Sequence, residues 1–319
     1  MSNYITGLHH VTAITSDAQQ NVDFYAGILG LRLVKKTINF DAPDVYHLYY
    51  GDEVGQPGTI LTFFPFNSIS KGRKGKGQLT VTSFSIPENS LDYWVKRLKK
   101  FRIPFENPSQ RFDDEVFIYF EDQDGLGIEL IANKSDSRTG YTYGQIPQEH
   151  AIKGFYSVAL SEEGYERTAG LLTDQMDHKL VTEKGNRFRF STTGIPGSFV
   201  DIVCSPEERR GQGGSGTVHH VAFATQDDRT QLEFREELLT KGTVNPTPVI
   251  DRQYFHSIYF REPGGILFEA ATSNIGFTLD EPKEHLGESL KLPSWEEKNR
   301  SEIERLLTRI ELNIDKFKD

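Results

Sequence analysis

Strand-like apolar runs and amphipathic helical stretches alternate along the chain in an order that recurs four times. The first unit opens with an apolar run, continues with apolar residues at helical spacing, and closes with three more strand-like runs separated by turn residues. Gly30 ends the helical stretch, as expected for a residue that readily adopts positive φ. We therefore predict a βαβββ unit, with its elements at 8–15, 17–29, 32–39, 46–51 and 59–66.

The same unit is predicted three more times, and this repetition is the main organisational feature of the sequence. The opening strands lie at 78–86, 155–160 and 219–225, and the helical stretches that follow them lie at 90–100, 164–176 and 229–239. A single unit leaves sheet edges and one apolar face uncovered, so we expect units to pair around a shared cleft. The predicted fold is α+β, with four βαβββ modules forming two barrel-like curved mixed sheets, and a C-terminal helix.

These modules divide the chain into two predicted halves. Residues 1–134 are predicted to form an N-terminal domain of two modules, and residues 153–275 a C-terminal domain of two modules. A polar linker at 135–152 joins them. The tail, 276–319, carries an apolar stripe that predicts a helix over 294–317. That stripe either packs onto the body of the protein or forms a subunit interface, so a homo-oligomer remains an open alternative.

Composition narrows the classes of function. The 319 residues carry a net charge of −10, which argues against sequence-independent nucleic-acid binding because that activity needs a basic face. No apolar run reaches the length of a bilayer span, and the N-terminus lacks the features of a signal peptide. Cys204 is the single cysteine, so no intrachain disulfide forms. We therefore expect a cytoplasmic protein with no membrane or nucleic-acid partner.

Two His-His pairs occupy equivalent positions in the first and fourth units, at His9-His10 and His219-His220. The last strand of the fourth unit carries Glu269. If these two units face each other, His10, His220 and Glu269 form the two-histidine, one-carboxylate set of non-haem Fe(II) oxygenases, which leaves positions open for substrate and O₂. A lone strand histidine is more often structural, but two pairs at repeat-equivalent positions favour metal binding.

The closing strands of the other units are not expected to add a second carboxylate to this set. Aligning the Pro-Gly turns before the closing strands places Phe63 at the position of Glu269 in the first unit, and Ile202 holds that position in the third. The second unit has Glu129 there but lacks a matching histidine, so Glu129 is interpreted as a structural remnant. Three protein ligands are therefore predicted instead of four.

Several motifs of the chain occur together in one known group of proteins. They are Leu8-His9-His10-Val11-Thr12, Gly30-Leu31-Arg32-Leu33-Val34-Lys35-Lys36-Thr37, Tyr46-His47-Leu48-Tyr49-Tyr50, Pro57-Gly58-Thr59, Glu149-His150-Ala151, His219-His220 and Pro263-Gly264-Gly265-Ile266-Leu267-Phe268-Glu269. With them, the chain resembles the vicinal-oxygen-chelate superfamily over nearly its full length. Within that superfamily it is similar to the glyoxalase-family ring-cleaving dioxygenases, including the hydroquinone dioxygenases.

The resemblance implies metal ligands at the same three residues and further roles near them. It implies that His9, Thr12, His219, Arg252 and Tyr259 lie next to the metal ligands and act in catalysis or contact the substrate. Tyr259 could instead be a sheet tyrosine with its hydroxyl in solvent, and Arg252 a surface salt-bridge partner. On an ideal strand His9 and His219 point away from the metal, unless a β-bulge or strand end redirects them. His256 is a weaker acid–base candidate.

The implied function is that of a non-haem Fe(II)-dependent, extradiol-type ring-cleaving dioxygenase. Its substrates would be O₂ and a small hydroquinone- or catechol-like aromatic diol, in the catabolism or detoxification of aromatic compounds. Fe(II) is the expected cofactor, with Mn(II) as the alternative metal. A metal-dependent glyoxalase-like isomerase or thiol transferase using the same cleft stays open, as does a non-catalytic binder of aromatic molecules.

Overall fold

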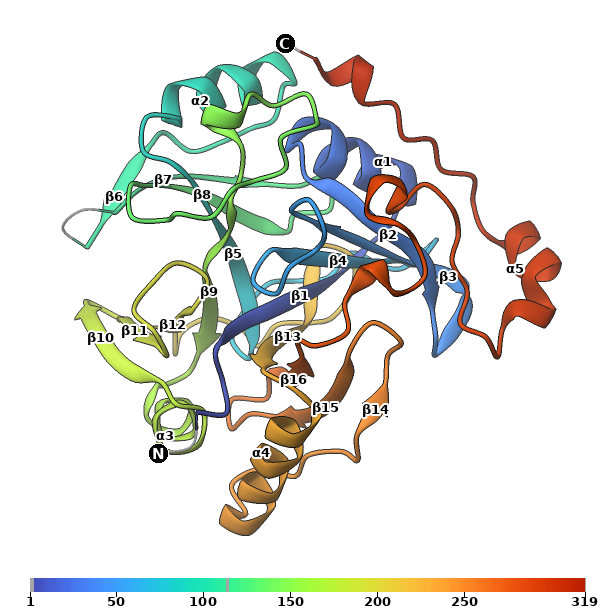
Figure 1. Cartoon of the computed structure of the whole chain (residues 1–319). Coiled ribbons are helices and arrows are strands. Elements are labelled where there is room, and N and C mark those ends of the chain that lie inside the picture. Colours follow the sequence, from blue (N-terminus) through green and yellow to red (C-terminus); the bar gives the residue numbers. More distant parts are fainter. Residues whose placement is uncertain (1–2, 113–114, 319) are drawn as a thin grey trace.

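The computed structural model describes residues 3–112 and 115–318. Residues 1–2, 113–114 and 319, which belong to the predicted domains and tail, lie outside the described residues. The chain forms two eight-stranded mixed sheets accompanied by short helices (Figure 1). This architecture confirms the predicted α+β fold of four βαβββ modules in two curved sheets.

The first sheet combines the first and fourth modules in the strand order β14-β15-β16-β13-β1-β4-β3-β2. The first module supplies β1 (Gly7–Thr15), β2 (Arg32–Asn39), β3 (Ala42–Gly51) and β4 (Ile60–Pro65). The fourth supplies β13 (Thr217–Thr225), β14 (Ile250–Asp251), β15 (His256–Arg261) and β16 (Leu267–Thr272).

The second sheet combines the second and third modules in the order β10-β11-β12-β9-β5-β8-β7-β6. The second module supplies β5 (Gln78–Pro87), β6 (Ser109–Arg111), β7 (Glu115–Glu121) and β8 (Gly127–Asn133). The third supplies β9 (Gly154–Glu162), β10 (Lys179–Lys184), β11 (Arg187–Ser191) and β12 (Phe199–Cys204). Each sheet therefore takes one module from each half of the chain, and the division into two sequential domains stays a prediction.

One helix follows the opening strand of each module, as the sequence predicts. These helices are α1 (Ala18–Val22) with its π-helical continuation η1 (Asp23–Ile28), α2 (Leu91–Lys100), α3 (Glu166–Gln175) and α4 (Asp228–Lys241). The ends of α4 follow the expected capping chemistry. Asp227 accepts from Thr230 N at 2.8 Å at its start, and Gly242 at φ 67° ends it. Among the described residues, no helix is both long and apolar enough to cross a bilayer.

In each sheet, the two opening strands pair with each other at the centre. β1 pairs antiparallel with β13, and β5 pairs antiparallel with β9. Each closing strand then lies parallel to the opening strand of its own module. The condition set by the sequence, that the first and fourth modules face each other, is therefore met along β1 and β13.

The tail differs from the long helix predicted over 294–317. α5 spans Arg300–Leu306, Leu307 is extended at ψ 135°, and the chain forms only short 3₁₀ turns before and after this helix. Ile303 packs in a small core with Ile38, while Phe317 lies against Gly27. The apolar stripe is thus not buried as one face. Between these two points the chain is extended (Figure 1), and Glu311 N donates to Gln19 Oε1 at 2.8 Å. The turns before and after α5 are η5 (Glu297–Asn299) and η6 (Ile314–Phe317), and the described residues also form the 3₁₀ turns η2 (Gln148–His150), η3 (Phe277–Leu279) and η4 (Lys283–His285).

Candidate metal centre and active site

Three buried side chains from three strands of the first sheet meet at one point. His10 on β1 and His220 on β13 place their Nε2 atoms 3.2 Å apart. Glu269 on β16 places Oε2 3.2 Å from the His10 nitrogen and 3.0 Å from the His220 nitrogen. β13 pairs with both β1 and β16, so the pairing of the first and fourth modules creates this cluster.

Each histidine pair sits at a β-bulge. The register between β1 and β13 slips at His9 and again at His219, so each of these residues is the extra one in its strand. Their rings lie beside the ligand rings. The Nδ1 atoms of His9 and His10 are 2.9 Å apart, and those of His219 and His220 are 2.8 Å apart.

A short hydrogen-bonded chain determines which nitrogen of His10 faces the cluster. His9 Nε2 lies 3.2 Å from the carbonyl oxygen of Thr272, which can only accept, so this nitrogen carries the proton. Burial and then the neighbouring His10 lower the pKa of His9 to about 3, so the ring is neutral and its Nδ1 holds a lone pair. That lone pair accepts from His10 Nδ1–H. The Nε2 atom of His10 is therefore left free to bind a metal.

The second pair follows the same pattern. Burial and the neighbouring His220 lower the pKa of His219 to about 4, so His219 is also neutral at physiological pH. Burial likewise lowers the pKa of His220. With His220 Nδ1–H donating to His219 Nδ1, the Nε2 atom of His220 presents its lone pair to the cluster.

Glu269 is held in its charged form without a full set of hydrogen bonds. Burial raises its pKa, but the cationic forms of His10 and His220 lower it by more, so positive charge next to this carboxylate holds the net pKa well below the usual value. Ser257 donates to Oε1, whereas Oε2 accepts no well-directed hydrogen bond from the described residues. A buried carboxylate oxygen facing two imidazole lone pairs is unfavourable without a cation. The three ligand atoms lie within 4.8 Å of one another, and this donor set fits a divalent metal ion.

A cavity of about 350 Å³ opens over the two histidine ligands. This volume lies within the usual range for a small-molecule site. Its walls are largely aromatic, and the rings come from β3, β4, the β2–β3 turn and the loop before β15. The aromatic residues that supply these walls are Phe40, Tyr49, Phe64, Phe66 and Phe255.

Arg252 and Tyr259 form a polar wall of the same cavity. Arg252 Nε donates to the Tyr259 hydroxyl at 3.1 Å, and its guanidinium carbon lies 5.4 Å from the Tyr259 ring centroid. Tyr259 is the cross-strand neighbour of Glu269, and its ring centroid lies 5.8 Å from that of His220. Burial, followed by the charge of Glu269, raises the pKa of Tyr259, so its hydroxyl keeps the proton and can donate.

Thr12 belongs to a hydrogen-bonded chain that the sequence did not indicate. The hydroxyl oxygens of Thr12 and Thr62 lie 2.8 Å apart, and His47 Nε2 lies 2.8 Å from the Thr62 oxygen. The Tyr49 hydroxyl lies 2.7 Å from His47 Nδ1. His47 lines the cavity, and burial holds its pKa well below the usual value, so it is neutral. Its motif at 46–50 carried the family resemblance, but nothing in the sequence linked this histidine to the metal centre.

The residue of the first module that corresponds to Glu269 is Thr62, and the alignment to Phe63 was wrong by one position. Thr62 lies across from Thr12, which is two residues beyond the ligand on β1. Glu269 likewise lies across from the residue two beyond the ligand on β13. Phe63 is fully buried away from the cavity, with its ring centroid 4.4 Å from that of Tyr25. Thr62 is not a carboxylate either, so this position still adds no second carboxylate to the cluster.

A left-handed glycine marks the corresponding position in every module. Gly58, Gly125, Gly197 and Gly265 have φ angles of 85°, 95°, 90° and 100°, a region that favours glycine. The residue four positions later is the one that faces inward. These inward residues are Thr62, Glu129, Asp201 and Glu269. Asp201 therefore replaces Ile202 in the third module, which is a second correction of the same kind.

The second sheet holds ion pairs where the first sheet holds its candidate metal ligands. Arg111 donates to both carboxylate oxygens of Glu129, at 2.8 and 2.6 Å. Arg189 donates to both oxygens of Asp201, at 2.6 and 2.8 Å. Glu115 accepts from both arginines and joins the two pairs. Glu129 is thus held in a salt-bridge network.

The weaker acid–base candidate from the sequence, His256, lies away from the metal cluster. Its Nδ1 atom pairs with Asp228, at the start of α4. It is not among the residues that line the cavity over the ligands.

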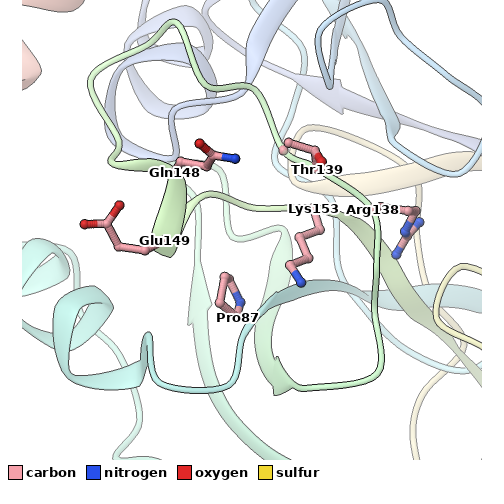
Figure 2. A pocket seen from close by; sticks show the side chains of 7 residues that line it. Pro87, Arg138, Thr139, Gln148, Glu149 and Lys153 are labelled. Carbon is pink, nitrogen blue, oxygen red and sulfur yellow. The ribbon is translucent and has the colours of Figure 1, made fainter.

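A further cavity, of about 410 Å³, lies beside the predicted linker (Figure 2). Its two cationic side chains already have partners. Arg138 donates to Asp136 at 2.7 Å and to the Phe155 carbonyl at 2.6 Å, and Lys153 donates to the Asp136 carbonyl. Glu149 is its only lining carboxylate among the described residues, and no described histidine or cysteine lines it. It therefore lacks the donor set of a metal centre.

Comparison with known proteins agrees with this geometry. Residues 7–130 match the family described as the glyoxalase/bleomycin resistance protein/dioxygenase superfamily. Over 98% of its length the chain is 43% identical to a Bacillus subtilis (strain 168) protein with the provisional name ring-cleaving dioxygenase MhqO, of which it covers 99%. The chain belongs to this superfamily. Its place is among the ring-cleaving dioxygenases, so the predicted family and enzyme class are confirmed.

Two further likenesses define the position of the chain within the glyoxalase/dioxygenase superfamily. It is 34% identical, over 95% of its length and 96% of the relative, to the chlorohydroquinone/hydroquinone 1,2-dioxygenase of Sphingobium indicum. The crystal structure of a provisionally named dioxygenase from Bacillus subtilis subsp. subtilis str. 168 matches it with a TM-score of 0.93, at 43% identity over 97% of this chain and 98% of that one. Glyoxalase I from Zea mays, at 14% identity and a TM-score of 0.62 over 84% of this chain and 92% of that one, shares the fold.

Proposed function

We propose that the chain is a non-haem Fe(II)-dependent, extradiol-type ring-cleaving dioxygenase that acts on hydroquinone- or catechol-like aromatics with O₂. The observation that carries this proposal is the buried set of two imidazoles and one carboxylate beneath an aromatic-walled cavity. Relatives named as ring-cleaving and hydroquinone dioxygenases support the same reaction class. Fe(II) is the proposed metal, with Mn(II) as the alternative.

The number of protein ligands favours oxygenation over isomerisation. At the position of the first module that corresponds to Glu269, Thr62 directs its hydroxyl to Thr12 and His47. A site with three protein ligands leaves adjacent places for substrate and O₂, which oxygenation of a coordinated phenol requires. A second carboxylate at position 62 would occupy one of those places.

The side chains around the cavity have separable roles in this proposal. The chemistry supplied by a bound Fe(II) ion is acidification of a coordinated phenol and electron transfer between ring and O₂. His10, His220 and Glu269 hold the ion. The aromatic walls hold the ring flat and exclude water. Tyr259 and Arg252 present hydrogen-bond donors to oxygens that gain negative charge as the ring opens.

Anaerobic reconstitution followed by an O₂-uptake screen tests the proposed function. The protein is loaded with Fe(II) or Mn(II) under argon and then mixed with O₂ and a panel of hydroquinones and catechols. We expect O₂ uptake with Fe(II) and a ring-opened product that contains both oxygen atoms. Isomerisation of a glutathione hemithioacetal, or thiol transfer, without O₂ uptake on any aromatic diol would contradict the proposal.

Single alanine variants of His10, His220 and Glu269 test the metal centre separately from turnover. Each should lose most of its bound iron while remaining folded, because each removes one of three donors. Metal analysis and circular dichroism on the same preparation give the two readouts. Full iron content in the His10 variant would show that the two modules do not share a metal. Catabolism or detoxification of aromatic compounds in the cytoplasm remains part of the proposal.

A further inference from the structure

The mouth of the cavity is closed by two segments from different modules. The end of β2 contributes Asn39, the turn that follows contributes Phe40 and Asp41, and the segment after β14 contributes Arg252. Asn39 Oδ1 accepts from Asp41 N at 2.9 Å, which fixes the turn. Across the mouth, Arg252 Nη1 and Asp41 Oδ2 lie 3.2 Å apart.

The two partners of this ion pair lie at different depths. The Asp41 side chain is 75% exposed and that of Arg252 is 21% exposed, so the carboxylate lies on the solvent side of the guanidinium. Arg252 cannot turn away freely, because its Nε donates to Tyr259 and its guanidinium lies over the Tyr259 ring. Asp41 is therefore positioned between incoming solutes and the inner cation.

Arg252 and Asp41 are also the lining residues that carry permanent charges at neutral pH. Because they pair with each other, the described lining offers no unpaired cation to an anionic group on a ring. A metal dication and Glu269 together leave one positive charge, and a coordinated phenolate neutralises it. A carboxylate elsewhere on the same ring would compete with Asp41 for the charge of Arg252 and would be repelled by Asp41.

We infer that the Asp41–Arg252 ion pair selects aromatic diols without an anionic ring substituent, and that Asp41 determines this selectivity. The inference rests on the proposed function and specifies its substrate class. Hydroquinones and catechols that carry neutral substituents fit the cavity, because a neutral group accepts hydrogen bonds from Arg252 and Tyr259 without breaking the Asp41–Arg252 ion pair. Ring acids such as dihydroxybenzoates do not.

Two ligands of the same shape and different charge test this inference by binding alone. They are 4-hydroxybenzamide, which is neutral, and 4-hydroxybenzoate, which is an anion at pH 7. Each has a single ring hydroxyl. Calorimetric titration of the Fe(II)-loaded protein under argon gives both Kd values, and the readout is their ratio. We expect the wild type to favour the amide. Asp41→Asn should shift the ratio toward the benzoate by about tenfold, because it frees Arg252 and removes the repulsion.

Two further variants separate charge from a merely wider mouth. Asp41→Glu keeps the carboxylate and should keep the wild-type preference. In the double variant Asp41→Asn with Arg252→Met, the gain for the benzoate should disappear, since the freed cation is its cause. Equal gains for both ligands in Asp41→Asn, or a benzoate gain that survives the loss of Arg252, would overturn the inference while leaving the proposed function intact. Failure of the wild type to bind either ligand would overturn this inference, whereas O₂ uptake on aromatic diols decides the proposed function separately.

Discussion

The imidazole of His9 should set the metal affinity of the site although it is not a ligand. The substitution His9→Leu keeps the position apolar and buried but removes the acceptor 2.9 Å from His10 Nδ1. In the metal-free variant His10 can move its proton to Nε2 and donate it to Glu269 Oε2, 3.2 Å away. Metal binding must then drive that proton back to Nδ1, where no acceptor remains.

The magnitude follows from the cost of that stranded proton. A buried N–H without a partner costs about 1–3 kcal/mol, and loss of an outer partner of a metal-bound histidine typically lowers affinity about 10- to 100-fold. We therefore expect the Kd for Fe(II) of His9→Leu to rise about 10- to 100-fold. The assay is anaerobic competition between the protein and a chelator of known affinity.

A matched control separates this effect from general loss of a buried histidine. His178 is 2% exposed, and its Nδ1 atom contacts the Met176 carbonyl far from the ligands in sequence. His178→Leu should lower stability without changing the Kd for Fe(II). An unchanged Kd in His9→Leu, or equal losses in both variants, would refute the argument that the His9 hydrogen bond selects the metal-binding tautomer.

Three other expectations follow from the same contacts. Tyr259→Phe should lower turnover with normal iron content, because Tyr259 lies beside the ligands without being one; unchanged turnover on the best substrate would make it a packing residue. Thr62→Glu should retain iron but lose O₂ uptake, because its carboxylate would fill an open coordination position. Phe63→Glu should only lower the melting temperature, because it buries an unpaired carboxylate beside Tyr25. A Thr62→Glu variant that keeps wild-type O₂ uptake, with its carboxylate bound to the metal in a crystal structure, would contradict this expectation. Burial lowers the pKa of His178 from 6.5 to about 4. Between these two values the unfolded chain binds one proton more than the folded chain, so the free energy of unfolding falls as the pH falls. Denaturant titrations across this pH range should show that His178→Leu reduces the loss by about 3 kcal/mol.

That His10, His220 and Glu269 lie together could be predicted from the sequence, because the repeat places them at equivalent inward positions. His10 and His220 hold equivalent positions in two modules, and Glu269 holds the inward position of a closing strand. These relations depend on strand periodicity and repeat length, which are local properties of the chain. Pairing of β1 with β13 was only a condition in that argument. Contacts between residues 210 apart leave no direct trace in one sequence.

The error at Phe63 has a specific physical source. The dipeptide Pro57-Gly58 looks like Pro263-Gly264, but the backbone feature that the modules share is the left-handed residue, which is Gly58 in one and Gly265 in the other. Aligning the prolines therefore shifts the strand by one residue, and a one-residue shift moves every side chain to the other face. Sequence identity of the turn gave the wrong register, whereas the conformational requirement for glycine gives the right one.

The residues that the sequence missed share one property, which is dependence on a distant strand. His47 gains its place through Thr62 on the neighbouring strand β4, and Asp41 gains its partner from the fourth module. The bulges that bring His9 and His219 beside the ligands also arise only when β1 and β13 pair. None of these relations is encoded by periodicity within a single unit.

The two sheets show that inward side chains, not the backbone, decide where a metal can bind. The closing strands of the second sheet carry two inward carboxylates, Glu129 and Asp201, one more than those of the first sheet. However, Val81 and Ser157 stand where the first sheet has its histidines, and Arg111 and its neighbours neutralise the acids. Carboxylates whose charge is already neutralised by paired guanidinium groups attract a further cation only weakly. A match to the superfamily over residues 7–130 spans modules from both sheets and contains only one of the three candidate ligands. Family membership therefore identifies the fold, while the imidazoles distinguish the sheet that carries the candidate metal centre.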